Sequence, residues 1–141
     1  MKKILPIFAL TLVIAACNSG KDKYPEMAQS MCDCFNKIKD SLPPSAMKLF
    51  EKAAVAPSAK ETYESGAKEL SPEDLQRMMS ALLQVSKPGS AVSDCLSEMD
   101  KKYKTADSQQ EATRKMVDAL KGSTGCELMV TMMRMQVEKG K

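Results

Sequence analysis

The chain has 141 residues, a formal net charge of +3, and neither histidine nor tryptophan. Removal of the N-terminal segment described below takes away two lysines and leaves 19 basic residues against 18 acidic ones. This balance lacks the large positive charge that is typical of a nucleic-acid-binding protein. The absence of histidine excludes the commonest general base, the usual zinc ligand and every nucleophile that histidine activates. We therefore expect no enzyme, no cofactor and no nucleic-acid partner, and a single domain after processing.

The first seventeen residues have the organisation of a signal peptide. Two lysines are followed by an apolar run over residues 4–14, which is too short to span a bilayer but has the length of a signal-peptide core. The next step is more specific, because the Ile-Ala-Ala-Cys sequence that ends at Cys17 resembles the lipobox of bacterial lipoproteins. The resemblance implies that residues 1–16 are removed, and that Cys17 is lipidated on its sulfur and acylated on its new amino group.

The same resemblance implies a location. An anchor of several acyl chains holds far more firmly than a single chain, so we expect the mature protein to stay on a membrane of the bacterial cell envelope. In bacterial lipoproteins an aspartate after the cysteine favours the inner membrane, so Asn18 favours the outer membrane, with the periplasmic and surface faces both open. Residues 17–23 are expected to form a short lipidated tether and residues 24–141 a single helical domain.

Apolar residues recur at three- and four-residue steps along the domain, and no stretch shows the sustained alternation of a strand. The first helix should begin at Tyr24, with Pro25 in its first turn, and end at Pro43-Pro44. Prolines, glycines and helix-capping patterns divide the remaining chain into further helices. The predicted helix-start residues are Ser58, Ser71, Ser90 or Ser93, Ser108 and Thr124. The sequence therefore predicts an all-α bundle of five to seven helices.

Four cysteines remain after Cys17, and an even number in an oxidising compartment indicates two disulfides. Cys32 and Cys34 lie two residues apart on the first predicted helix, so their side chains point about 200° apart around its axis. A bond between them would strain the helix, whereas Cys95 and Cys126 both lie on apolar stripes. We predict that one of the first two cysteines bonds Cys95 and that the other bonds Cys126. A redox-active pair and thiolate metal binding are the alternatives.

Twelve methionines are many for this length, and the last predicted helix is apolar on two sides. Such a helix is either central and buried or in contact with something else. The first hypothesis is a central helix in which methionine fills gaps in the core. The second is an adaptable surface for a partner helix, a lipid or an apolar ligand. The third is Cu(I) binding by thioethers, because these methionines resemble the clustered methionines of bacterial copper-handling proteins. The possible ligand or partner face consists of Leu128, Met129, Met132, Met133 and Met135.

Together these features predict an envelope lipoprotein that is not an enzyme. The first functional hypothesis is a binding or scaffold module that engages another envelope protein. The alternative is a small carrier that holds an apolar ligand, or a soft metal ion such as Cu(I), within the bundle. The two hypotheses make different structural demands, because a carrier needs an internal cavity and a scaffold needs an exposed apolar patch larger than the few hundred Å² normal for a monomer.

Overall fold

The computed structural model describes residues 22–140, so the predicted signal peptide, the Cys17 lipidation site and most of the tether lie outside the described residues. Over the described range every regular element is helical, which confirms the predicted all-α fold. There are seven α-helices and one short 3₁₀ turn: α1 (Tyr24–Asn36), η1 (Lys39–Ser41), α2 (Pro44–Val55), α3 (Ala59–Glu69), α4 (Pro72–Leu83), α5 (Ala91–Lys102), α6 (Gln109–Ala119) and α7 (Glu127–Lys139).

Serine side chains begin four of these helices, as the sequence predicts. Each serine hydroxyl accepts a hydrogen bond from the backbone N–H three residues later, which satisfies one of the donors that a helix start leaves unpaired. The capping serines are Ser58 for α3, Ser71 for α4, Ser90 for α5 and Ser108 for α6. Local sequence chemistry therefore fixes where most of the helices start.

Two predicted helix ends are wrong. The first helix stops at Asn36, and the chain passes through η1 to an extended residue, Leu42, with ψ 138°, which is the conformation that a following proline favours. The last helix begins at Glu127 and Thr124 does not cap it. Gly125 has φ +87°, a left-handed conformation outside the helix, and its N–H donates to the Glu127 carboxylate at 2.8 Å.

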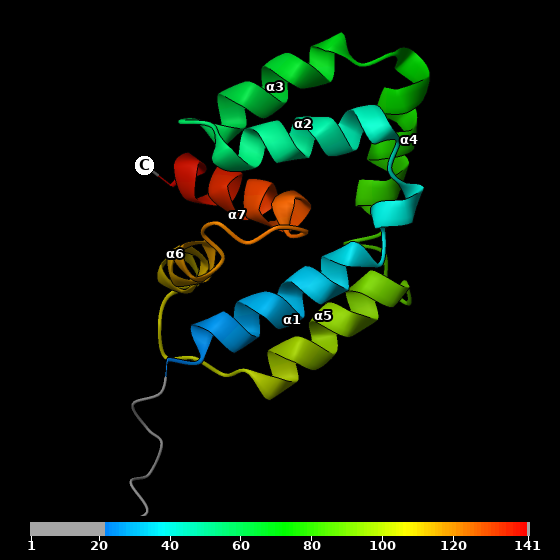
Figure 1. Ribbon diagram of the computed structural model, residues 1–141. Coiled ribbons are helices and arrows are strands. Elements are labelled where there is room, and N and C mark those ends of the chain that lie inside the picture. Colours follow the sequence, from blue (N-terminus) through cyan, green and yellow to red (C-terminus); the bar gives the residue numbers. More distant parts are fainter. Residues whose placement is uncertain (1–21, 141) are drawn as a thin grey trace, which may run out of the picture.

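Helix α7 lies at the centre of the bundle, as Figure 1 shows. On one side of it α2 and α3 pack against each other as an antiparallel pair, and on the other side α1 packs beside α5 and α6. α7 contacts helices of both layers, and α4 runs along one edge from the α2–α3 pair towards α5. This arrangement agrees with the hypothesis of a central last helix.

The core forms on both sides of α7. Leu128 and Thr131, three residues apart, are buried on one side of the helix, where the Thr131 hydroxyl donates to the Phe50 carbonyl of α2 at 3.0 Å. Met129 and Met133, four residues apart, are buried on another side. Methionine thus fills gaps between helices that carry few aromatic side chains.

Two disulfides join α1 to its neighbours. Cys32 is bonded to Cys126 at the start of α7, and Cys34 is bonded to Cys95 on α5. The predicted arrangement, in which each α1 cysteine reaches a different partner, is confirmed, and the structure adds which cysteine takes which. Helices α1, α5 and α7 are therefore held together covalently.

Candidate functional site

A half-open groove of about 800 Å³ lies where α1, α5, α6 and α7 meet. Six methionines contribute to its lining, together with a few aliphatic and aromatic side chains from these helices and from the turn after α4. We call this feature the methionine groove, and its apolar lining consists of Met27, Met31, Phe35, Val85, Leu96, Ala112, Met116, Met132, Met133 and Met135. A volume of this size with a mainly apolar lining is typical of a site for a small molecule.

Helical periodicity places these side chains. Met27, Met31 and Phe35 are spaced four residues apart on α1, so they form one stripe along one side of the groove. Met132 and Met133 come from the middle of α7 and face that stripe across the groove. Met27 and Met133 are each 6% exposed, whereas Met31 and Met132 are half-buried, so the lining runs from the core to solvent.

The structure divides the face that the sequence singled out on the last helix. Met132, Met133 and Met135 line the groove, whereas Leu128 and Met129 are packed in the core and do not. Three methionines on other helices complete the lining, and the sequence places each of them on an ordinary apolar helix stripe: Met27, Met31 and Met116. Spacing alone could not find them as a set, because they join the α7 methionines only through tertiary packing.

Both disulfides stabilise the methionine groove. Cys34 lies one residue before Phe35 and bonds Cys95, which precedes the groove residue Leu96. The second disulfide, from Cys32, fixes α1 to the start of α7. Three of the four helices that form the groove are therefore cross-linked, which limits how far it can close or splay.

A polar network occupies one end of the groove. The Tyr24 hydroxyl donates to the Asp107 carboxylate and lies 2.8 Å from the Thr105 hydroxyl, and Lys115 donates to the same carboxylate at 2.8 Å. The hydrogen bond from Lys115, followed by the one from Tyr24, holds the pKa of Asp107 below its ordinary value. The bond to Asp107 in turn raises the pKa of Tyr24. Asp107 is therefore an ionised, fully engaged carboxylate that holds α1 to the α5–α6 loop.

The groove rim carries few charges. Asp100 and Lys139 lie at its edge in addition to Asp107, with amide and hydroxyl groups from Gln109, Tyr103 and Gln136 between them. Within residues 22–140 no group of three or more histidine, cysteine, aspartate or glutamate side chains could hold a metal ion. The commonest possible metal donors in the groove are the thioether sulfurs of its methionines, which suit soft ions such as Cu(I).

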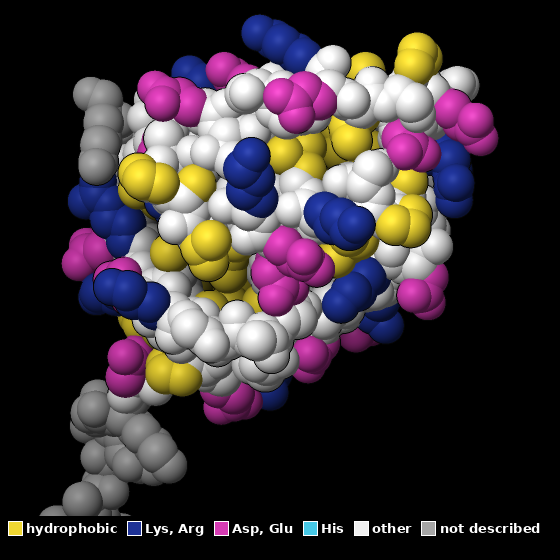
Figure 2. All heavy atoms as spheres, turned by 45° about the horizontal axis from the view of Figure 1, so that its top comes forward, with side chains coloured by type: hydrophobic (Ala, Val, Ile, Leu, Met, Phe, Trp, Pro, Cys, Tyr) yellow, Lys and Arg dark blue, Asp and Glu magenta, His cyan; other side chains and the backbone are white. Residues whose placement is uncertain are grey.

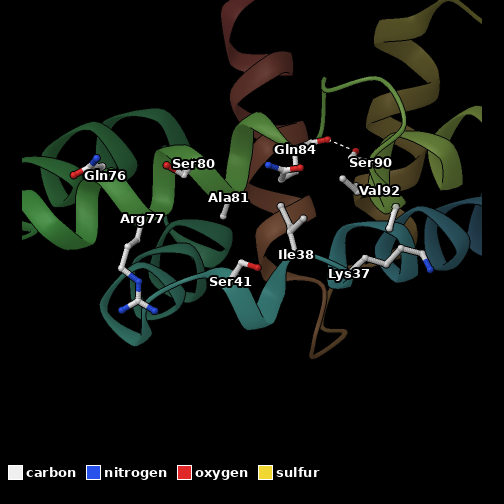
Figure 3. Close-up of a pocket in the computed structure, with 11 residues that line it drawn as sticks. Lys37, Ile38, Ser41, Gln76, Arg77, Ser80, Ala81, Gln84, Ser90 and Val92 are labelled. Carbon is white, nitrogen blue, oxygen red and sulfur yellow. Dashed lines mark hydrogen bonds between the residues drawn. The ribbon is translucent and has the colours of Figure 1, made fainter.

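A second hollow, of about 540 Å³, lies between η1, α4 and the start of α5. Figure 3 shows Ile38 and Val92 at its centre, with Lys37 and Arg77 at opposite ends and pointing away from each other. Ser90 donates to the Gln84 carbonyl at 2.5 Å across it. Its charged groups do not converge, so it lacks the focused polar contacts of a ligand site.

The outer surface carries interspersed charges of both signs. Figure 2 shows Lys, Arg, Asp and Glu side chains of both signs interspersed over one face, with hydrophobic side chains visible between them, some protruding and some in hollows. The large apolar side chains that are well exposed in the described part of the chain are Val55 on α2 and Met79 and Leu83 on α4. No helix of this part is both long and apolar enough to cross a membrane. No protein-family model, curated protein or solved structure matches the chain.

Proposed function

We propose that this protein is a bacterial envelope lipoprotein, anchored to the outer membrane through Cys17, whose helical domain is a non-enzymatic binding module. The lipobox resemblance around Cys17 supports the anchor. The domain begins at Tyr24, only seven residues after Cys17, so a lipid on Cys17 would keep it close to the membrane surface. The anchor supplies the location, and the domain supplies the binding site.

We propose further that the module acts as a carrier and holds an elongated apolar ligand in the methionine groove. The observation that carries this proposal is the lining itself, six methionines from three helices around about 800 Å³. Methionine is unbranched and polarisable, so it adapts to ligands of irregular shape. The carrier hypothesis asks for an internal cavity, and the half-open groove supports it to the extent that Met27 and Met133 in its lining reach the buried core.

Cu(I) is the less favoured cargo. A soft ion needs several thioether sulfurs aimed at one point. The methionines here are instead interleaved with the carbon side chains of Phe35, Leu96 and Ala112 around an open volume. An apolar molecule would contact all of these side chains, whereas a single ion would use only a few of them.

A scaffold role is the second candidate function. Met79 is 51% exposed and Leu83 is 63% exposed, and the two lie one turn apart on α4. A helix of a partner envelope protein could cover them. Two side chains make a smaller patch than a stable protein partner usually covers, so this role ranks below that of the groove.

The binding proposal is tested with the apolar fluorophore N-phenyl-1-naphthylamine, whose emission rises when it leaves water. Titration of the domain released from its anchor should give saturable binding. Met132→Glu, which places a carboxylate in the groove, should weaken binding by about tenfold or more, because an unpaired buried charge is costly. Met79→Glu, the same change on the exposed side of α4, should leave it unaltered. Equal binding by both variants would place the apolar site elsewhere.

The anchor is tested separately. Cells fed a labelled palmitate should incorporate the label into the protein, and the mature protein should fractionate with membranes. Cys17→Ser removes the thiol on which lipidation depends, so it should abolish both the label and the membrane association. Labelling that survives Cys17→Ser would contradict the assignment of this residue.

A further inference from the structure

The point where the chain enters the domain lies at one end of the methionine groove. Tyr24, the first residue of α1, bonds through its hydroxyl to Thr105 and Asp107, and both of these residues line the groove. The preceding residue is fixed as well, since the Lys23 ammonium donates to the Lys104 carbonyl. One turn later on α1, Met27 is already part of the lining. The tether therefore leads directly to the groove.

The tether is short enough to deliver its own lipid there. Five residues, 18–22, separate Cys17 from Lys23, which is held by its bond to Lys104. An extended chain spans at most about 3.5 Å per residue, so Cys17 lies at most roughly 20 Å along the chain from Lys23. A group attached to Cys17 can therefore reach this end of the groove. Linkage of this kind gives an effective concentration in the millimolar range, on the order of what short flexible linkers achieve.

The charges at the rim favour an occupant without an anionic headgroup. Asp100 and Asp107 present carboxylates, and of the cations nearby Lys115 is already bonded to Asp107. Lys139 is the one ammonium among the groove-lining residues. Asp107 is neutralised by its pairing with Lys115, and Asp100 and Lys139 carry one charge of each sign, so the rim offers the carboxylate of a fatty acid or the phosphate of a phospholipid no net positive charge. The acyl chains of a lipidated cysteine are joined by uncharged linkages and need no such partner.

We propose that one acyl chain of the lipid on Cys17 occupies the methionine groove while the remaining chains stay in the membrane. The proposal rests on the proposed function, since it needs both the lipidated cysteine and an apolar site. Burial of a methylene group away from water is about equally favourable in an apolar groove and in a bilayer. The acyl chain on Cys17 is therefore favoured over the chains of free lipids because it is attached to the same molecule as the groove. Two acyl chains suffice for stable anchoring, so the protein can give up one of them to the groove. Any other apolar ligand must then displace this chain.

Photocrosslinking of the intact lipoprotein in its own membrane tests this proposal. Cells are fed a palmitate analogue with a photoreactive diazirine near the end of its chain, irradiated, and the protein is purified and digested with trypsin. The expected product joins the lipopeptide of residues 17–21 to the groove peptide of residues 122–134, which contains Met132 and Met133. Met132→Glu should lower its yield by about tenfold or more. Met79→Glu should leave the yield unchanged.

Each outcome separates this proposal from the function on which it rests. Groove peptides joined only to free lipids, without residues 17–21, would overturn self-occupancy and uphold a groove that binds apolar molecules. Groove peptides with no crosslink at all would overturn self-occupancy, and fluorophore binding by the released domain would then decide the function. A variant that fails to fold is recognised by a mass four hydrogens above that of the protein with both disulfides. If Met132→Glu fails in this way, Met135→Glu, at another half-buried position of the groove, replaces it.

Discussion

Arg134 and Glu138 lie one turn apart on α7 and together hold the turn between α2 and α3. The Arg134 guanidinium donates to four backbone carbonyls at the end of α2, among them Ala54 at 2.8 Å and Ala56 at 2.6 Å. The Glu138 carboxylate accepts from the Ala59 and Lys60 N–H groups and the Ser58 hydroxyl at the start of α3. The positive Arg134 thus faces the partially negative C-terminal end of α2, and the negative Glu138 faces the partially positive N-terminal end of α3. Both contacts are favourable to the helix dipoles.

Glu138→Gln should destabilise the domain, because the neutral amide gives up charge-assisted hydrogen bonds to α3. Hydrogen bonds to charged groups contribute about 1.5–3 kcal/mol, and partial exposure of Glu138 reduces this to about 1–2 kcal/mol. Urea denaturation measures the loss. Glu98→Gln on α5, an exposed glutamate without a partner among the described residues, is the matched control and should change stability by less than about 0.5 kcal/mol.

The contribution of Glu138 should disappear in acid. Burial raises the pKa of this carboxyl, but the hydrogen bonds from Lys60, Ala59 and Ser58, with the Arg134 charge, outweigh burial and hold the pKa below its ordinary value. A carboxylate whose folded pKa is depressed stabilises above its ordinary pKa and loses this effect as the pH falls through the folded value. The difference between wild type and Glu138→Gln should therefore be full at about pH 7 and shrink towards about pH 2. A difference that grows in acid would contradict the arrangement.

Loss of the disulfides should nearly unfold the protein. Cys32–Cys126 and Cys34–Cys95 join residues 94 and 61 positions apart. In the chain-entropy model each contributes about 4 kcal/mol, against a total stability of about 5–15 kcal/mol for a domain. Circular dichroism with and without reductant should show a large drop in the urea midpoint. Peptide mapping of the oxidised protein should recover both pairs, and a Cys32–Cys34 peptide would refute the pairing.

Gly66 should be intolerant of a methyl group. A Cβ at this position of α3 would clash with Leu49 Cδ1 on α2, and Leu49 is 6% exposed. Gly66→Ala should therefore cost about 1–3 kcal/mol through overpacking, although alanine favours helix by about 1 kcal/mol. In a Leu49→Ala background the space is free, so the same change should stabilise. Thermal denaturation of the four proteins checks this reversal, and an unchanged sign in both backgrounds would exclude the contact as the cause.

Much of the fold could be predicted because its signals are local. Serine caps such as Ser58 and Ser108 mark helix starts in a few residues, and the opposed directions of Cys32 and Cys34 follow from helix geometry alone. The methionine groove could not be predicted, because it depends on which stripe of α1 meets α7, and Met31 reads as an ordinary core position in sequence. Glu138 was also beyond reach, since an acidic residue near a helix end is usually solvated and its partners lie about 80 residues away.

Native mass spectrometry of the domain, exported to an oxidising periplasm without Cys17, tests the central claim most directly. The claim is that the methionine groove holds an apolar ligand. We expect a covalent mass four hydrogens below that of the reduced chain and a non-covalent apolar adduct, present in wild type and Met79→Glu and absent from Met132→Glu. A bare wild-type domain, or an adduct that Met132→Glu retains, would contradict the claim.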